Sequence, residues 1–354
     1  MENKLIKPMK KLTFLLICLV FACNSGNNKQ NNSSKEIESI IQDYNDHEGY
    51  DKEKYPLGLQ TRAFYKEEAE YAEQLLKKFD NIKVDELTES EQISVELLKF
   101  VLQDKIDFYT FESFLNPLLS DSGFHSDLNY MVRPLADKKG AIDYLNKLNA
   151  IPEFVNQGLE NLREGLEKGV SQPLVIFKGY ESTYNIHIVD NYEDSFFYSP
   201  FKKLSENIPQ EQKDSIKLAA QNAINKNVTP EFIRIKTFFE TEYLPKTRTT
   251  LGVSETPNGK EYYQNRINYY TTSTQYSADD IHQIGLKEVA RIKALMEQII
   301  SELEFKGSFS DFFNFLRTDE QFYAKTPEEL LMIARDMAKR ADAQLPRFFK
   351  TLPR

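Results

Sequence analysis

The sequence is poor in histidine, which limits the metal chemistry that its side chains can perform. A zinc hydrolase needs two imidazoles one helical turn apart, with a glutamate beside them. No two histidines of this chain have that spacing, and the sequence contains just His47, His125, His187 and His282. We therefore assign no residue to metal binding or to cofactor binding within the chain.

Glycine-based and serine-based catalytic motifs are also missing. The chain has 13 glycines, and none stands in the spacing of a phosphate-binding or dinucleotide-binding loop. No Gly-x-Ser-x-Gly elbow occurs, and the run Ser199–Lys202 matches Ser-x-x-Lys without the partner motifs of that enzyme class. We treat this match as chance and assign no catalytic residue.

Beyond the first 11 residues, basic clusters are absent as well. The formal net charge is -9, and lysine and glutamate alternate along most segments. A nucleic-acid partner needs clustered positive charge and is therefore not expected. With 40% hydrophobic and 12% aromatic residues in 354, the chain can bury a substantial core, as one large domain or two ordinary ones.

The N-terminus has the pattern of an export signal. Four lysines within the first 11 residues precede an apolar stretch of about ten residues, Leu12–Phe21, which is too short to span a membrane as a helix. The run then ends in Val-Phe-Ala-Cys23, which resembles a bacterial lipobox. We predict a signal peptide over 1–22, lipidation of Cys23 and attachment to a bacterial envelope membrane, on the periplasmic or outer face. The alternative is an ordinary cleaved signal in which Cys23 is incidental.

The segment after Cys23 is expected to be a tether. Cys18 would be removed with the signal, so the mature chain would have no pair of cysteines for a disulfide. Asn24–Lys35 is polar and of low complexity. We therefore predict a flexible tether over 23–35 and a folded body over 36–354.

Apolar residues in the body recur at helical spacing, which predicts an all-α fold. Thr88 with Glu91 forms a capping-box pattern, and Thr229 and Thr326 are expected to be N-caps because each precedes a proline. Ser277 opens a helix that we expect to lie across the core. One exception, a small β-hairpin, is predicted within 169–209, where Leu174–Phe177 and Ile186–Val189 are β-prone.

The residues around each histidine predict a structural role for it. His47 and His125 stand among polar residues and are expected to be solvated, and His187 is expected to be a satisfied strand residue. For His282 we favour a packing role in a helix over a direct role in a site.

The C-terminal third carries a series of motifs in a fixed order. They are Pro257-Asn-Gly-Lys-Glu-Tyr-Tyr263, Tyr269-Tyr-Thr-Thr-Ser-Thr274, Asp280-Ile-His-Gln-Ile-Gly-Leu-Lys-Glu-Val289, Phe305-Lys-Gly307, Phe315-Leu-Arg-Thr-Asp319 and Thr326-Pro-Glu-Glu-Leu-Leu331. In this order they resemble the bacterial domain-of-unknown-function 885 family (DUF885), whose members look like all-helical zinc peptidases. A weaker resemblance extends back through Met131-Val-Arg-Pro134 to Tyr55-Pro-Leu-Gly58.

The resemblance implies a metal site that these residues do not supply. In the family, the His-Glu-x-x-His helix lies further toward the C-terminus than any position of this sequence, so zinc is expected only in a full-length member. The chain then corresponds to the N-terminal part of a zinc peptidase, inactive alone, with a peptide substrate or a separate C-terminal half as partner. The alternative is a non-catalytic helical lipoprotein that binds a peptide or a protein.

One run of aromatic and polar residues could line a cleft. Tyr262, Arg266, Tyr269 and Tyr270 offer phenol hydroxyls and a guanidinium that could bind a peptide carboxylate. The same spacing also places them on one helix face, where tyrosines usually pack with their hydroxyls at the rim. Both interpretations stay open at this point.

Overall fold

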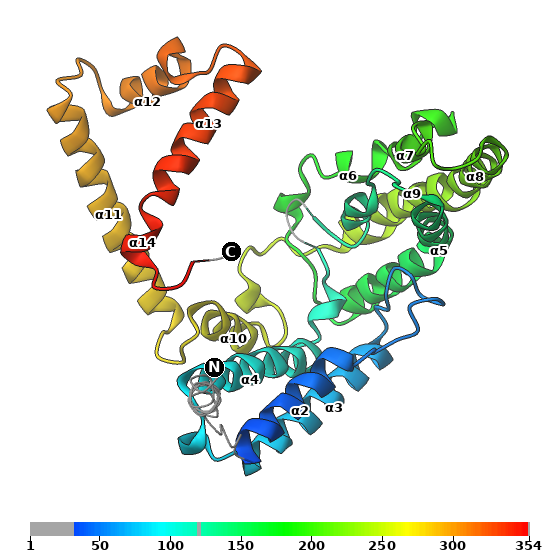
Figure 1. Ribbon diagram of the computed structural model, residues 1–354, viewed down its shortest axis with the longest axis horizontal. Coiled ribbons are helices and arrows are strands. Elements are labelled where there is room, and N and C mark those ends of the chain that lie inside the picture. The colour runs from blue at the N-terminus through cyan, green and yellow to red at the C-terminus, as the bar shows by residue number, and fades with distance from the viewer. Residues whose placement is uncertain (1–31, 119–121, 353–354) are drawn as a thin grey trace, which may run out of the picture. The chain divides into compact units, whose positions relative to one another are not determined.

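The computed structural model describes residues 32–118 and 122–352, and these are all-α as predicted (Figure 1). Within these ranges the extended pairings are two isolated bridges, Leu118 with Gly123 and Pro173 with Arg248. No helix in the described part of the chain is both long and apolar enough to cross a membrane. The chain divides into two compact units, residues 1–273 and 274–354.

Three helices form the N-terminal part of the first unit: α2 (Asn32–Asp46), α3 (Arg62–Lys78) and α4 (Glu89–Thr110). The capping box predicted for Thr88 and Glu91 is present and fixes the start of α4. α2 begins at Asn32, so its first turn lies inside the segment that was expected to be a tether. The predicted Cys23 anchor and residues 23–31 lie outside the described residues. The three helices share one core, formed by Ile37, Ile40, Ala72, Leu75, Phe79, Ile82, Leu87, Val95, Leu98 and Leu102.

The long helix α5 (Lys138–Glu167) organises the rest of the first unit. It packs against α8 (Gln210–Ala223) and α9 (Thr229–Phe238), and its buried face belongs to a second, larger core. Gly158 lets α5 approach Phe124 closely, because a Cβ at this position would lie 2.6 Å from the phenylalanine ring.

The chain continues from α8 into α9 without a break, so the N-cap predicted at Thr229 is wrong. A π-helical turn, η8 (Ile224–Val228), joins the two helices, and the N–H of Thr229 donates to the carbonyl of Ile224. Pro230 has no N–H to donate, and the wider turn lets the helix pass it. A second π-helical turn, η9 (Phe239–Tyr243), follows α9.

The predicted hairpin within 169–209 is also wrong, because this region consists of short helical turns. Leu174–Phe177 forms the 3-10 helix η5, followed by α6 (Ser182–Asn185) and α7 (Ser199–Lys202). This region places Phe177, Tyr180, Tyr184 and Phe197 in the larger core. Burial of these aromatic rings therefore overrides the β-propensity of the sequence.

The first unit ends with α10 (Gly259–Thr271). The remaining 3-10 turns of the described residues are η1 (Phe79–Asn81), η2 (Val84–Glu86), η3 (Ser113–Leu115), η4 (Asp127–Met131), η6 (Tyr192–Asp194), η7 (Phe196–Tyr198), η10 (Leu244–Lys246), η11 (Val253–Glu255) and η12 (Glu320–Phe322).

The second unit contains α11 (Ala278–Glu302), α12 (Phe309–Thr318), α13 (Pro327–Asp342) and α14 (Leu345–Phe348). The two helix starts predicted in this unit are present, since Ser277 forms a capping box with Asp280 and Thr326 caps α13. The expectation that α11 lies across the core is wrong, because none of its residues is buried. Among the described residues of this unit, Phe312 alone is buried.

Candidate functional site

Two of the four residues predicted to line a cleft attach α10 to α4. The guanidinium of Arg266 lies 2.8 Å from a carboxylate oxygen of Asp104 and sits over the ring of Tyr269, 4.9 Å from its centroid. Tyr269 in turn stacks on Phe100, with the ring centroids 5.0 Å apart. These contacts are those of a helix that packs on its neighbour.

The other two have different surroundings. Tyr270 is 80% exposed. Tyr262 lines a pocket of about 350 Å³ where the ends of α4 and α5 meet the start of α10. At its edge, Glu112 has a left-handed backbone (φ 50°) and accepts hydrogen bonds from Arg62 and Lys168. Burial opposes ionisation of Glu112, but these two cations outweigh it and lower its pKa.

A larger groove lies between the loop 50–58 and one face of α5. It comprises a polar compartment of about 990 Å³ and a compartment of about 470 Å³, which share Lys54, Tyr55, Asn149 and Ala150. The loop is fixed to α5 because the N–H of Gln60 donates to Gln157 and the amide of Asn161 donates to the carbonyl of Gln60, both at 2.7 Å. Both α5 side chains are buried, so the groove has a firmly positioned wall.

The groove offers apolar, amide, cationic and acidic side chains together. Leu57 and Phe154 line the smaller compartment, and Asn146 lies in the larger one. Two of its lysines are paired, Lys52 with Glu48 and Lys139 with Asp143. Lys147 has no carboxylate within salt-bridge distance among the described residues, and the ammonium of Lys54 lies 4.9 Å from the centroid of the Tyr55 ring. Glu53 and Glu153 also line the groove. The groove was not predicted from the sequence, although the motif Tyr55–Gly58 at its edge was noted.

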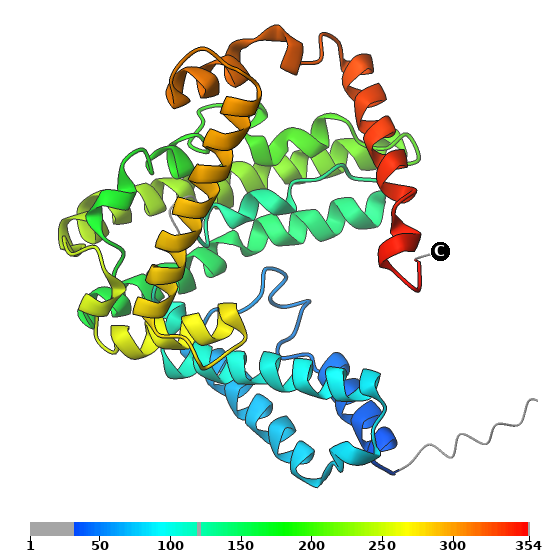
Figure 2. The same ribbon diagram turned by 90° about the vertical axis from the view of Figure 1, so that its left-hand side faces the viewer.

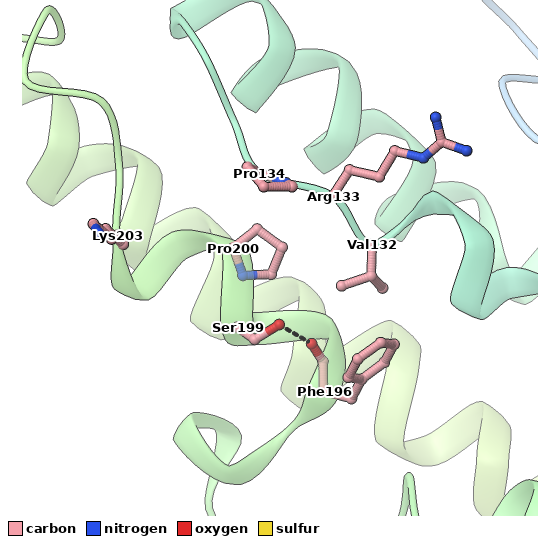
Figure 3. A pocket seen from close by; sticks show the side chains of 7 residues that line it. All are labelled: Val132, Arg133, Pro134, Phe196, Ser199, Pro200 and Lys203. Atoms are coloured by element: carbon pink, nitrogen blue, oxygen red, sulfur yellow. Dashed lines mark hydrogen bonds between the residues drawn. The ribbon is translucent and has the colours of Figure 1, made fainter. Parts of the chain in front are cut away.

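A smaller, mainly apolar pocket of about 330 Å³ brings Val132–Pro134 against the segment 196–203 (Figure 3). In Figure 3, Val132 and Pro200 face the pocket, while the guanidinium of Arg133 points away from it. The hydroxyl of Ser199 donates to the carbonyl of Phe196 at 2.6 Å. The serine of the Ser-x-x-Lys match therefore has a local structural role.

Two histidines are buried, against the expectation for His125. His125 is 0% exposed and packs among aromatic rings, with Nε2 2.9 Å from the hydroxyl of Thr183. His187 is not the strand residue that was expected: it is 1% exposed, lies in a helical turn region and contacts the rings of Phe197 and Phe232. Neither nitrogen of His187 has a hydrogen-bond partner among the described residues. Burial is the main cause that lowers the pKa of His125 to about 3 and that of His187 to about 4.

The remaining histidines are separate from one another. His47 is not solvated as expected: its Nε2 lies 2.6 Å from Glu68 and its ring stacks on Tyr71. Burial opposes ionisation of Glu68, but Lys105 and His47 outweigh it and lower its pKa. His282 is exposed on α11. Within the described ranges, no three His, Cys, Asp or Glu side chains are arranged to hold a metal ion.

The described residues define an all-helical protein, and the comparisons identify its family. Residues 47–354 match the family described as "Bacterial protein of unknown function (DUF885)", and the chain belongs to this family. The crystal structure of a "putative lipoprotein from Colwellia psychrerythraea" is similar, with a TM-score of 0.71 and 19% sequence identity. The similarity covers 91% of this chain and 58% of that one, so this chain spans little more than half the length of the Colwellia protein. No curated protein matches the chain.

Proposed function

We propose that this chain is a membrane-tethered lipoprotein whose helical body is the peptide-binding part of a zinc-dependent peptidase fold. The metal site of that fold lies outside these 354 residues, so the chain alone binds peptide without hydrolysing it. Three observations support the proposal: the lipobox-like sequence ending at Cys23, the family membership, and the likeness in fold to a longer "putative lipoprotein".

The groove between the loop 50–58 and α5 carries the peptide-binding part of the proposal. Its two compartments, of about 990 and 470 Å³, are large enough for several residues of an extended peptide. Leu57 and Phe154 can receive an apolar side chain, and the amide of Asn146 can bond to peptide backbone groups. A site of this kind selects for shape and backbone more than for one side chain.

Lys147 gives the groove a local site for a peptide carboxylate. Lys54 and Lys147 line the groove without a salt-bridge partner among the described residues, Lys52 and Lys139 are neutralised by carboxylates, and Glu53 and Glu153 belong to the same lining. A free peptide carboxylate beside Lys147 would pair with its ammonium group. We therefore expect peptides with a free C-terminus to bind better than the same peptides amidated.

A titration tests this site. The probe is a fluorescein-labelled octapeptide that ends in phenylalanine with a free carboxylate, and its C-terminal amide serves as the comparison. Lys147→Glu should weaken binding of the free acid about tenfold and bring the two peptides to similar affinity. Lys202→Glu makes the same charge change at an exposed site that does not line the groove, and should alter binding less than twofold. Equal effects of the two substitutions would refute the assignment of the groove.

The second candidate function is a non-catalytic lipoprotein that binds a protein partner. The observation that favours it is the exposure of apolar side chains on α11 and α13 of the second unit. The two functions differ in one readout, because only the first predicts hydrolysis once the missing part of the fold is supplied.

A further inference from the structure

The helices of the second unit have apolar faces that their own unit does not cover. On α11, Ile284, Ile292, Leu295 and Ile299 follow one face and are 43–51% exposed, and on α13 the row formed by Leu330, Ile333 and Met337 is 39–62% exposed. Among the described residues of the unit, Phe312 of α12 alone is buried. Figures 1 and 2 show α11 and α13 joined through α12 and lying apart along most of their lengths.

These helices are nevertheless strongly defined by their own sequence. Capping boxes open α11 at Ser277 and α12 at Ser308, and the hydroxyl of Thr326 accepts the N–H of Glu329 at the start of α13. Local signals set where each helix begins, but amphipathic helices in water gain most of their stability from packing of the apolar face. Two long apolar rows in one small unit therefore mark a docking surface.

We propose that this surface, the apolar rows of α11 and α13, binds the part of the family fold that this chain does not span. The Colwellia structure matches 91% of this chain, yet more than a third of that protein lies outside the match. That remainder is the polypeptide expected to cover the surface, whether it is joined to the present residues or supplied by a separate chain. The proposed function also relies on this remainder, but its binding to the rows of α11 and α13 requires neither zinc nor peptide.

Charge supports a protein partner with an apolar face of its own. One charged residue, Glu288, lies within the α11 row between Ile284 and Ile292, and its carboxylate pairs with Arg291, while Lys293 and Glu297 pair on the opposite face of the helix. A partner therefore meets an apolar row interrupted by one neutralised carboxylate, and burial of apolar side chains drives the association.

Photo-crosslinking from the surface tests the proposal in the native bacterium. A benzophenone amino acid replaces Leu295 or Ile333 in the full chain, and the crosslinked peptides are identified by mass spectrometry. The matched control places the same group at Glu297, on the other side of α11. We expect Leu295 and Ile333, but not Glu297, to crosslink to sequence that corresponds to the unmatched part of the Colwellia fold.

Each other outcome overturns the proposal. Crosslinks to a second copy would make the surface a homodimer interface, crosslinks to residues 32–273 would make it an internal contact, and no crosslinks would leave it unoccupied. A second measurement uses purified complex: Leu295→Asp should weaken association at least tenfold, and Ala294→Asp, at the adjacent position facing away from the row, less than twofold. Because this readout is association, it can succeed even if the groove binds no peptide.

Discussion

At the scale of single residues, the two buried histidines make the free energy of unfolding depend on pH. Burial lowers the pKa of His125 to about 3 and of His187 to about 4, from an ordinary value of 6.5. Between pH 6.5 and 4 the unfolded chain therefore binds more protons than the folded one. The free energy of unfolding should be fully maintained above pH 6.5 and should fall as the pH drops through this window, by up to about 1.4 kcal/mol per pH unit for each histidine.

Urea unfolding between pH 7 and 4.5 measures this effect. His187→Phe removes one imidazole from an aromatic site and should flatten the dependence over this range, whatever its effect on stability at pH 7. His282→Phe, at an exposed position on α11, should leave the slope as it is. An unchanged slope for His187→Phe would show that His187 is not the group that titrates.

A glycine in α5 provides a second residue-scale prediction. Gly158→Ala places a methyl group 2.6 Å from the ring of Phe124 and should lower the free energy of unfolding by about 1–3 kcal/mol. Gly140→Ala is the control in the same helix, because its Cβ meets Asp137 at 3.4 Å, an ordinary contact. Thermal unfolding of the two variants should differ in this direction, and equal stability would contradict the close packing of α5 against Phe124.

At the scale of elements, the contacts of α10 predict a structural role for Arg266. Arg266→Met removes the ion pair with Asp104 and the contact with the Tyr269 ring, and should destabilise the first unit by about 1 kcal/mol. Its affinity for the octapeptide should not change. Tyr270→Ala, at an 80% exposed position, should alter stability by less than about 0.5 kcal/mol. A large loss of peptide affinity in Arg266→Met would instead favour the cleft interpretation.

Helix starts were predictable where a side chain alone determines them. The caps at Thr88, Ser277 and Thr326 depend on residues three or four apart, and all three are present. The N-cap predicted at Thr229 is wrong because Pro230 lies in a continuous helix with a π-helical turn. The hairpin predicted around Leu174 is wrong because tertiary burial of aromatic rings outweighs local β-propensity.

At the scale of the whole molecule, the groove could not be predicted because it joins distant segments. The loop 50–58 is held on α5 by hydrogen bonds from Gln60 to Gln157 and from Asn161 to Gln60, and Gln60 lies 97 and 101 positions from these two partners. Neither hydrophobic periodicity nor a sequence motif indicates a contact between such distant segments. Buried Gln157 and Asn161 within an apolar helical pattern were the available signal, because buried amides require partners.

Membrane attachment can be tested at this scale. If Cys23 carries the lipid, Cys23→Ala should move the protein from the membrane fraction to the soluble fraction of the cell envelope. Fractionation with immunodetection measures the distribution. A Cys18→Ala variant, changed inside the predicted signal, should remain with the membrane. Persistent attachment of the Cys23→Ala protein would contradict the lipoprotein assignment.

The central claim is that this chain binds peptide but does not carry the hydrolytic centre. The most direct measurement incubates the purified full chain with the free-acid octapeptide and zinc, then records bound and cleaved peptide from the same sample by mass spectrometry. The account predicts bound, intact peptide, with binding reduced by Lys147→Glu. Zinc-dependent cleavage that a chelator abolishes, by the chain alone, would contradict it.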